Sequence, residues 1–172
     1  MIAIGVPSGD MVHAGFAMSL ARLVGYCAGS GLPVALINEQ SSLVEVGRNR
    51  LVSTAKKAGA THLFMLDSDM TFPPDTLAHL ANVNVDVAWA NYNRRRNPIK
   101  PVCDPAKGHM ATGCMLIDMK VFESNKGPWF RVEWDGLKYT GEDVFFSKWV
   151  SEAGFSTACV DVDIGHIGTI VR

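Results

Sequence analysis

The sequence has no strong excess of charge, no long apolar run and no paired cysteine motif. Its 16 basic and 17 acidic side chains give a formal charge of −1, whereas a general binder of nucleic acid or membrane surfaces normally carries a basic excess. No apolar run approaches the roughly eighteen residues of a membrane span. The four cysteines are scattered in apolar contexts, as buried free thiols usually are. We therefore expect a cytoplasmic protein with no transmembrane segment and no nucleic-acid partner.

Internal repeats, low-complexity tracts and linker-like stretches are also missing from the sequence. The chain has 172 residues, 48% of them hydrophobic, which is enough apolar material for one sizeable core. Such a length and composition are typical of one globular unit. We therefore expect a single domain over residues 1–172.

What the sequence does contain is an alternation of apolar, strand-like runs and amphipathic, helical stretches. In the first half, the expected strands are 1–6, 33–38, 63–66 and 85–92, and the expected helices are 12–29, 43–58 and 73–80. This alternation favours a parallel sheet between two layers of helices. The second half is less regular, with a basic loop at 93–104, expected strands at 109–118, 129–134 and 156–160, and expected helices at 119–123 and 142–153.

The stretch His62–Met70, HLFMLDSDM, places two aspartates at the end of an apolar run. The run is typical of a strand buried on both faces, and ligands bind at the carboxyl edge of such sheets. If the chain stays extended, Asp67 and Asp69 point to the same side, about 6 to 7 Å apart. Two like charges so close together favour a divalent cation between them. The structural alternative is that the pair forms a turn and a helix cap.

Two later features also stand at the expected ends of elements. Glu142 and Asp143 begin an amphipathic helix, and His166 lies in the segment GHIG. An acidic pair at a helix start is commonly a cap, and a lone histidine is commonly a surface or packing residue. Their order after the aspartate pair is what favours a shared site.

The basic loop carries three consecutive arginines, Arg94, Arg95 and Arg96. Such a cluster suits a diphosphate or an acidic acceptor. It is equally typical of a solvated surface loop. The sequence alone therefore assigns these arginines no role.

Taken in order, the motifs resemble those of the GT-A nucleotide-sugar glycosyltransferases, in particular the family-two-like enzymes. The resemblance is carried by IAIGVPSG, GRNRLVSTAKKAGATHLFMLDSDM, ATGCMLIDMKVFE, GEDVFF and the final His166. It implies a three-layer, Rossmann-like α/β fold with a mixed, mainly parallel central sheet. It also implies transfer of a sugar from a nucleoside-diphosphate sugar, with a UDP-sugar expected, to an acceptor hydroxyl that the sequence does not identify.

Carried over position by position, the resemblance assigns a donor-binding set, a metal-binding set and a catalytic set. The donor-binding set is Pro7, Ser8, Gly9, Glu39, Arg48, Asn49, Asp67, Ser68 and Gly113, of which the first three would line the nucleoside pocket. The metal-binding set is Asp67, Asp69 and His166. The catalytic set is Asp143, as the base that removes the acceptor's proton, with Glu142 as the neighbouring carboxylate.

The implied chemistry suits these residue types. Cleavage of the donor leaves negative charge on a diphosphate, and a bound divalent ion stabilises that charge. A mixed carboxylate and imidazole site favours manganese over magnesium, which prefers oxygen ligands alone. His166 must be neutral to bind an ion, so we expect activity to fall at low pH.

Three alternatives stay open from the sequence. DSDMT also fits the DxDxT motif of haloacid-dehalogenase-type phosphatases, in which Asp67 would attack phosphorus, although that motif normally follows the first strand of its domain. A sugar nucleotidyltransferase would need a glycine-rich, basic loop after the first strand, which VPSGDMVHAG does not supply. The non-enzyme alternative is a nucleotide-sugar or glycan-binding module without turnover, but the presence of Asp143 favours an enzyme.

Overall fold

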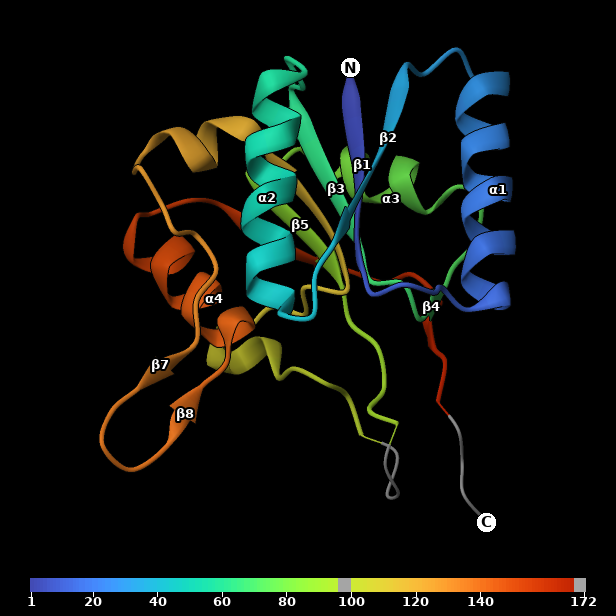
Figure 1. Ribbon diagram of the computed structural model, residues 1–172. Coiled ribbons are helices and arrows are strands. Elements are labelled where there is room, and N and C mark those ends of the chain that lie inside the picture. The colour runs from blue at the N-terminus through green and yellow to red at the C-terminus, as the bar shows by residue number, and fades with distance from the viewer. Residues whose placement is uncertain (96–99, 169–172) are drawn as a thin grey trace.

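A six-stranded sheet forms the centre of the computed structural model, which describes residues 1–95 and 100–168 (Figure 1). The strand order is β2-β1-β3-β6-β5-β9, with β1 at Ile2–Ser8, β2 at Val34–Gln40, β3 at His62–Leu66, β5 at Val87–Ala90, β6 at Cys114–Asp118 and β9 at Thr157–Val160. Neighbouring strands are parallel except at β6, which runs antiparallel to both β3 and β5. The expected mixed, mainly parallel sheet is confirmed.

Helices cover both faces of this sheet (Figure 1). The α-helices of the described residues are α1 (Ala14–Gly29), α2 (Val44–Lys57), α3 (Thr76–Asn82) and α4 (Glu142–Glu152), and the short 3-10 helices are η1 (Pro105–Lys107) and η2 (Met119–Glu123). None of the helices in this part of the chain combines the length and the apolar character that a membrane crossing needs.

Strand β3 shows how one apolar run supplies both faces of the sheet. Leu63 and Met65 pack in a buried cluster with residues of α2 and α4. Phe64 and Leu66 pack in a second cluster with residues of α1 and α3. All four side chains are fully buried, because alternate residues of a strand point to opposite faces. The expected three-layer arrangement follows from this alternation.

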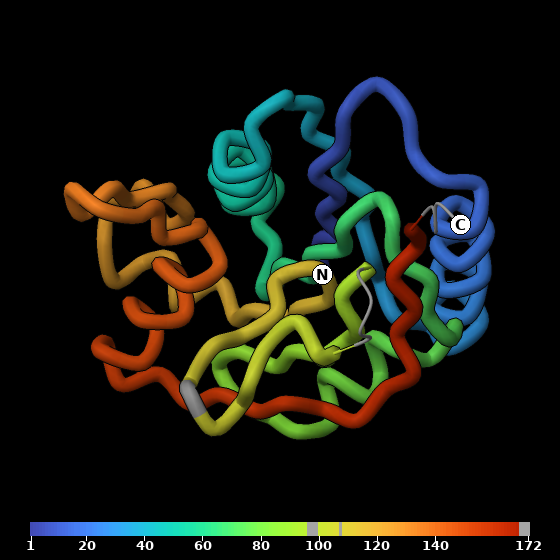
Figure 2. The backbone as a smooth tube through the Cα atoms, turned by 90° about the horizontal axis from the view of Figure 1, so that it is seen from below, coloured from blue at the N-terminus to red at the C-terminus, as the bar shows by residue number. Residues whose placement is uncertain are grey.

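At the carboxyl ends of β1, β2 and β3, two short strands form a separate ladder. They are β4 (Met70–Thr71) and β10 (Gly165–His166), and they pair antiparallel with Met70 opposite His166. Figure 2 shows the C-terminal segment, in red, crossing the underside of the molecule. The ladder thereby brings residues from two distant parts of the sequence to the turn that carries the two aspartates.

The strand expected at 109–118 begins only at Cys114. Part of the preceding backbone finds side-chain partners, since the N–H of Met110 donates to Ser147 Oγ at 2.9 Å. The first helix is also shorter than expected, because it begins at Ala14 instead of Val12. The N–H of Met110 is thus satisfied without the sheet ladder that the apolar pattern at 109–118 predicted.

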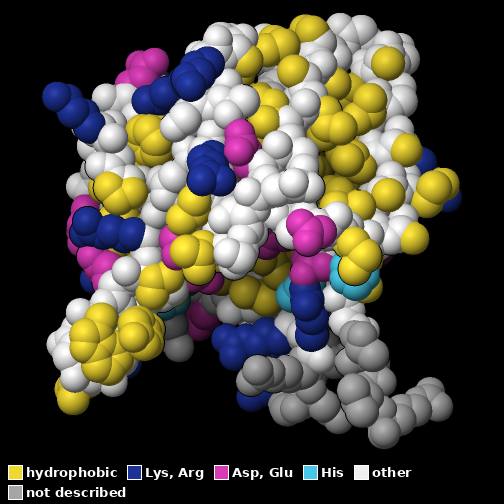
Figure 3. Space-filling view, viewed as in Figure 1, with side chains coloured by type: hydrophobic (Ala, Val, Ile, Leu, Met, Phe, Trp, Pro, Cys, Tyr) yellow, Lys and Arg dark blue, Asp and Glu magenta, His cyan; other side chains and the backbone are white. Residues whose placement is uncertain are grey.

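The strand expected at 129–134 is reduced to β7 (Glu133–Trp134). This strand pairs in a hairpin with β8 (Tyr139–Thr140), which the sequence did not predict. The hairpin projects from the molecule at the lower left of Figure 1. The hairpin carries the exposed apolar side chains of Trp134, Leu137 and Tyr139, and hydrophobic side chains gather in this region at the lower left of Figure 3. The earlier part of the expected strand is held by the side chain of Asn49, as described below.

Candidate functional site

A hollow at the carboxyl edge of the sheet gathers residues from the ends of β1, β2 and β3. It is lined by Pro7, Ser8, Gly9, Glu39, Ser41, Ser42, Leu43, Val44, Gly47, Asp67, Ser68 and Asp69. Six members of the predicted donor-binding set lie in this lining, although they are up to sixty-one residues apart in the sequence (Pro7, Ser8, Gly9, Glu39, Asp67 and Ser68). The edge of a parallel sheet is what brings them together.

The two aspartates that follow β3 do not continue the strand. Residues 67–69 form a turn, in which the N–H of Met70 donates to the carbonyl oxygen of Asp67 at 3.2 Å. The extended geometry that would have pointed both carboxylates the same way is therefore absent from this turn. As a result, Asp67 and Asp69 have different partners.

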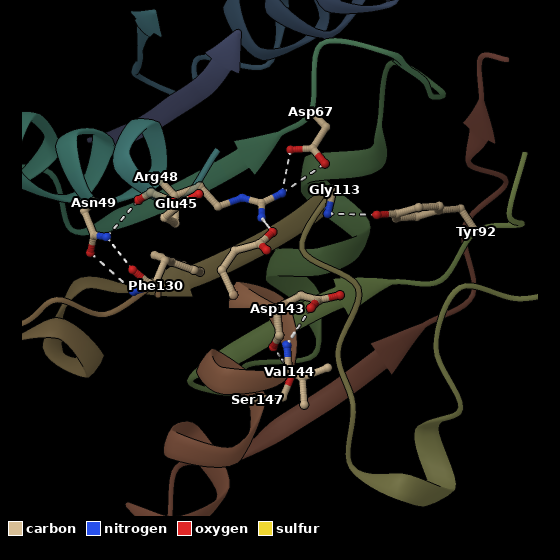
Figure 4. A network of polar contacts seen from close by, with 11 residues as sticks. Glu45, Arg48, Asn49, Asp67, Tyr92, Gly113, Phe130, Asp143, Val144 and Ser147 are labelled. Atoms are coloured by element: carbon tan, nitrogen blue, oxygen red, sulfur yellow. Dashed lines mark hydrogen bonds and ion pairs between the residues drawn. The ribbon is translucent and has the colours of Figure 1, made fainter. Parts of the chain in front are cut away.

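Asp67 is held by a buried arginine from α2. Nη2 of Arg48 donates to Oδ1 and Oδ2 of Asp67 at 2.9 and 3.0 Å, and Nη1 of the same guanidinium pairs with Oε1 of Glu142 (Figure 4). The Arg48 side chain is only 3% exposed. Burial opposes its charge, but Asp67 and Glu142 outweigh burial and raise the pKa of Arg48. The ion pairs of Arg48 with Glu142 and Asp67 thus connect α4 to the hollow.

The side chain of Asn49, the residue after Arg48, forms hydrogen bonds to backbone groups and does not line the hollow. Its Oδ1 accepts from the N–H groups of Trp129 and Phe130 at 2.9 and 3.2 Å. Its Nδ2 donates to the carbonyl oxygens of Glu45 and Phe130 at 2.7 and 2.6 Å (Figure 4). In the described structure, neither Arg48 nor Asn49 is part of the lining of the hollow.

Gly113 lies directly beneath Asp67. Its carbonyl oxygen accepts from the N–H of Asp67 at 3.0 Å, and its own N–H donates to Oη of Tyr92 at 3.2 Å (Figure 4). A Cβ added at this position would lie 2.5 Å from Tyr92 Oη and 3.0 Å from Asp67 Oδ2. Only a residue without a side chain allows this approach, because real Cβ contacts do not come so close.

The β4–β10 ladder places His166 beside Asp69. The N–H of Ile167 donates to the carbonyl oxygen of Asp69 at 2.8 Å, and Nε2 of His166 lies 3.8 Å from Asp69 Oδ1. Nδ1 of His166 is 3.1 Å from the carbonyl oxygen of Asn93, so Nδ1 carries the proton and Nε2 carries the lone pair, which accepts from Nε of Arg95 at 2.8 Å. Burial, helped by the nearby charge of Arg95, lowers the pKa of His166. The imidazole is therefore held neutral, as a metal ligand must be.

Asp69 and His166 together fit one side of a divalent-metal site. Oδ1 of Asp69 is buried, has no hydrogen-bond partner in the described structure, and lies 3.8 Å from Nε2 of His166. No group of three histidine, cysteine or acidic side chains in residues 1–95 and 100–168 is arranged to hold a metal. An ion here would need its remaining ligands from substrate oxygens and water, which is common for ions that bind diphosphates. Asp67, the third predicted ligand, is directed to Arg48 instead.

The predicted catalytic carboxylates stand at the start of α4. Oδ1 of Asp143 accepts from the N–H of Val144 at 2.7 Å, while its carbonyl oxygen accepts from Ser147 Oγ at 2.7 Å (Figure 4). Asp143 is not part of the lining of the hollow in the described residues. It is joined to that hollow through its neighbour Glu142 and the ion pair with Arg48.

Two residues at this edge were given no role by the sequence, Tyr92 and Arg95. The ring of Tyr92 packs edge-on against His166 with centroids 5.1 Å apart, and burial raises the pKa of its hydroxyl. In the sequence, the indication of this position was that Tyr92 ends the apolar, strand-like run 85–92. Arg95 contacts both Asp69 and His166, and its only signal was membership of the basic loop. Arg96 of that loop lies outside the described residues.

No protein-family model matches the sequence, and none of the curated proteins matches it. Solved structures match it in fold. A197 from STIV has a TM-score of 0.61 and 16% identity, over 98% of this chain and 86% of its own. A mutant of Drosophila β-1,4-galactosyltransferase 7, in a complex with manganese, UDP-Gal and xylobiose, has a TM-score of 0.62 and 13% identity, over 98% and 71% of the two chains. The inositol-1-phosphate CTP transferase of T. maritima has a TM-score of 0.53 and 11% identity, over 96% and 88%.

At these identities the likeness shows the fold alone. The matched structures include both glycosyltransferases and nucleotidyltransferases, and each likeness covers nearly all of this chain. The mixed six-stranded sheet between two helical layers agrees with them. The chain therefore has a GT-A-like fold, of the kind found in transferases that act on nucleoside-diphosphate sugars.

Proposed function

We propose that this protein is a metal-dependent glycosyltransferase that moves a sugar from a UDP-sugar to the hydroxyl group of an acceptor. The observation that carries the proposal is the pairing of Asp69 with His166 at the rim of the hollow. A ladder between strands far apart in the sequence holds together one carboxylate and one neutral imidazole. Such a pair is suited to manganese, and the hollow beside it offers room for a nucleoside.

In this proposal the hollow holds the donor. Pro7, Ser8 and Gly9 form its wall at the end of β1, and Glu39 lies at the end of β2. Oε1 of Glu39 accepts from Thr54 Oγ1 at 2.7 Å, so its carboxylate is already oriented. Asp69 and His166 would hold the divalent ion, and a bound ion would supply positive charge that stabilises the departing diphosphate. The fold likeness to a galactosyltransferase in a complex with manganese and UDP-Gal supports this choice of donor and ion.

Asp143 is the candidate base for the transfer. The acceptor oxygen forms a bond to the anomeric carbon, the bond from that carbon to the diphosphate breaks, and the diphosphate leaves with the electron pair. The proton of the acceptor hydroxyl passes to the carboxylate of Asp143. Glu142 has a different role. It forms an ion pair with Arg48 and so fixes the start of α4 relative to Asp67.

The phosphatase alternative fits the structure less well. Its nucleophile would be Asp67, whose two carboxylate oxygens both accept from Arg48. A carboxylate bonded in this way is a weak nucleophile, since its charge is already neutralised. A nucleotidyltransferase remains the second candidate, because such an enzyme shares the fold.

The test of the proposed function is thermal unfolding with a panel of nucleotide sugars, with and without Mn²⁺. A ligand at one hundred times its Kd stabilises the folded state by about 2.7 kcal/mol, so a UDP-sugar should raise Tm only when Mn²⁺ is present. Asp69→Asn should remove that response, whereas Asp75→Asn, which changes an exposed aspartate on another loop, should keep it. An unchanged response in Asp69→Asn would overturn the metal assignment.

Two further measurements separate the alternatives. Asp143→Asn should retain the Mn²⁺-dependent UDP-sugar response but lose turnover by about a hundredfold or more, as expected when a general base is removed. If the wild-type protein binds donor but never turns it over, it is a binding module. Release of pyrophosphate from a nucleoside triphosphate and a sugar phosphate would identify a nucleotidyltransferase instead.

A further inference from the structure

Arg95 joins the two candidate metal ligands. Its Nη2 forms an ion pair with Oδ2 of Asp69, and its Nε donates to Nε2 of His166 at 2.8 Å. The stem of the side chain packs along Gly168, where an added Cβ would lie 3.0 Å from Cβ, Cγ and Cδ of Arg95. One guanidinium therefore contacts both groups that would ligate an ion.

The guanidinium of Arg95 stabilises Asp69 and His166 electrostatically, as a bound cation would. The side chain of Asp69 is 24% exposed, and Asp69 lies at the rim of the hollow. Nε2 of His166 presents a lone pair that needs either a hydrogen-bond donor or a metal. Arg95 gives the first a counter-charge and the second an N–H donor. A divalent ion bonded to the same imidazole nitrogen cannot coexist with that N–H donor.

We propose that Arg95 is a built-in cation that occupies the site in the metal-free protein, and that a divalent ion binds only by displacing it. The inference deepens the proposed function and rests on its assignment of Asp69 and His166 as metal ligands. It adds that the resting protein is protected against metal uptake. Its consequence is that Arg95 weakens the apparent affinity for the ion.

The size of this effect follows from how often the site is free. An ion that binds only the free form has its affinity reduced by the free fraction. If Arg95 occupies the site nine-tenths of the time, its removal strengthens Mn²⁺ binding about tenfold. Arg94, the preceding residue, offers a matched control, because its Nη2 donates to the carbonyl oxygen of Val102 at 3.2 Å and not to the site.

The experiment measures Mn²⁺ binding without any nucleotide, from the electron paramagnetic resonance signal of the free ion. Arg95→Met keeps an apolar stem beside Gly168 but removes the charge, and Arg94→Met removes the same charge one residue away. We expect Arg95→Met to bind Mn²⁺ about tenfold more tightly than the wild type, and Arg94→Met to bind as the wild type does. Adding Asp69→Asn to Arg95→Met should abolish the gain, while thermal unfolding verifies that each variant is folded.

Equal Mn²⁺ affinity in Arg95→Met and Arg94→Met would overturn the inference, since only long-range charge would then matter. Failure of Arg95→Met to bind Mn²⁺ would also overturn it. The proposed function fails by a different result, namely the absence of a UDP-sugar response in the wild type with Mn²⁺ present. The two failures are therefore distinguishable in one set of proteins.

Discussion

Arg48 holds Asp67 through both carboxylate oxygens, at 2.9 and 3.0 Å from a single guanidinium nitrogen, and pairs with Glu142 through the other. A residue of α2 thereby fixes the loop after β3 against the first turn of α4. Because the arginine is buried, the arrangement is sensitive to the loss of any one partner. It also leaves Asp69 as the aspartate of the pair that faces His166.

We predict that Arg48→Met destabilises the protein by about 3 to 5 kcal/mol, because it leaves two carboxylates facing each other without a cation. Urea unfolding measures the change. Arg50→Met, an exposed change on the same helix, should cost less than about 0.5 kcal/mol. Neutralising the partners as well, in Arg48→Met with Asp67→Asn and Glu142→Gln, should recover most of the loss. No recovery in this triple variant would mean that packing, rather than charge, sets the cost.

Asn49→Ala should lower the free energy of unfolding by about 2 to 4 kcal/mol, since it removes bonds to several buried backbone groups at once. Ser53→Ala, which lies on the exposed side of the same helix and removes one bond to the carbonyl oxygen of Asn49, should have a small effect. Urea unfolding compares the two variants. Full stability in Asn49→Ala, together with lost nucleotide binding, would show that the residue belongs to the pocket and not to the scaffold.

Gly113→Ala should destabilise the protein by about 1 to 3 kcal/mol, because the added methyl group overlaps the hydroxyl of Tyr92. In the background of Tyr92→Phe the nearest atom is gone, although the ring carbon at 2.9 Å remains. The same change should therefore cost less there. A double-mutant cycle by urea unfolding measures the coupling, and strict additivity would place the strain elsewhere.

Asp86 gives a pH dependence of stability. Its carboxylate pairs with Lys120 at 2.5 Å and accepts from the N–H and Oγ of Ser156 at 2.7 and 2.8 Å. These bonds, chiefly the one to Lys120, lower the pKa of Asp86 in the folded protein. Because the folded pKa lies below the unfolded one, the stabilisation is complete above about pH 4, the ordinary pKa of an aspartate, and is lost as the pH falls through the folded pKa.

We therefore expect Asp86→Asn to cost about 1 to 2 kcal/mol at pH 7, and this difference from the wild type should shrink below pH 4. Urea unfolding at a series of pH values measures both curves. Asp75→Asn serves as the control, since Asp75 is an exposed partner of His79. A difference that stays constant down to pH 2 would contradict the assigned cause.

The layers of the fold were predictable from the sequence because local patterns determine them. The run from Leu63 to Leu66 is apolar at every position, and such a run fits a strand buried on both faces. The resemblance, and not a local pattern, assigned Pro7, Ser8, Gly9 and Glu39 to the donor pocket, and these residues line the hollow. The order and direction of β6 were expected only as part of a mixed sheet that the resemblance implied.

The partners of individual polar side chains were not predictable, because they depend on contacts between distant segments. No local pattern indicated that Arg48 would be buried or that Asn49 would bond to the backbone at Phe130, eighty-one positions away. The apolar pattern at 129–134 suggested a strand, but those side-chain bonds compete with a sheet ladder. Arg95 was ambiguous for the same reason, since its partner His166 lies seventy-one residues later.

The contact between Asp69 and His166 depends on a ladder of two residue pairs, Met70 with His166 and Thr71 with Gly165. So short a ladder can open locally at far lower free energy than the six-stranded sheet unfolds. Opening would separate the imidazole from the carboxylate while every core strand stayed paired. Under the proposed function, conditions or variants that open only this ladder would abolish metal binding without lowering the melting temperature. An unchanged melting temperature would therefore not show that the proposed metal site is intact.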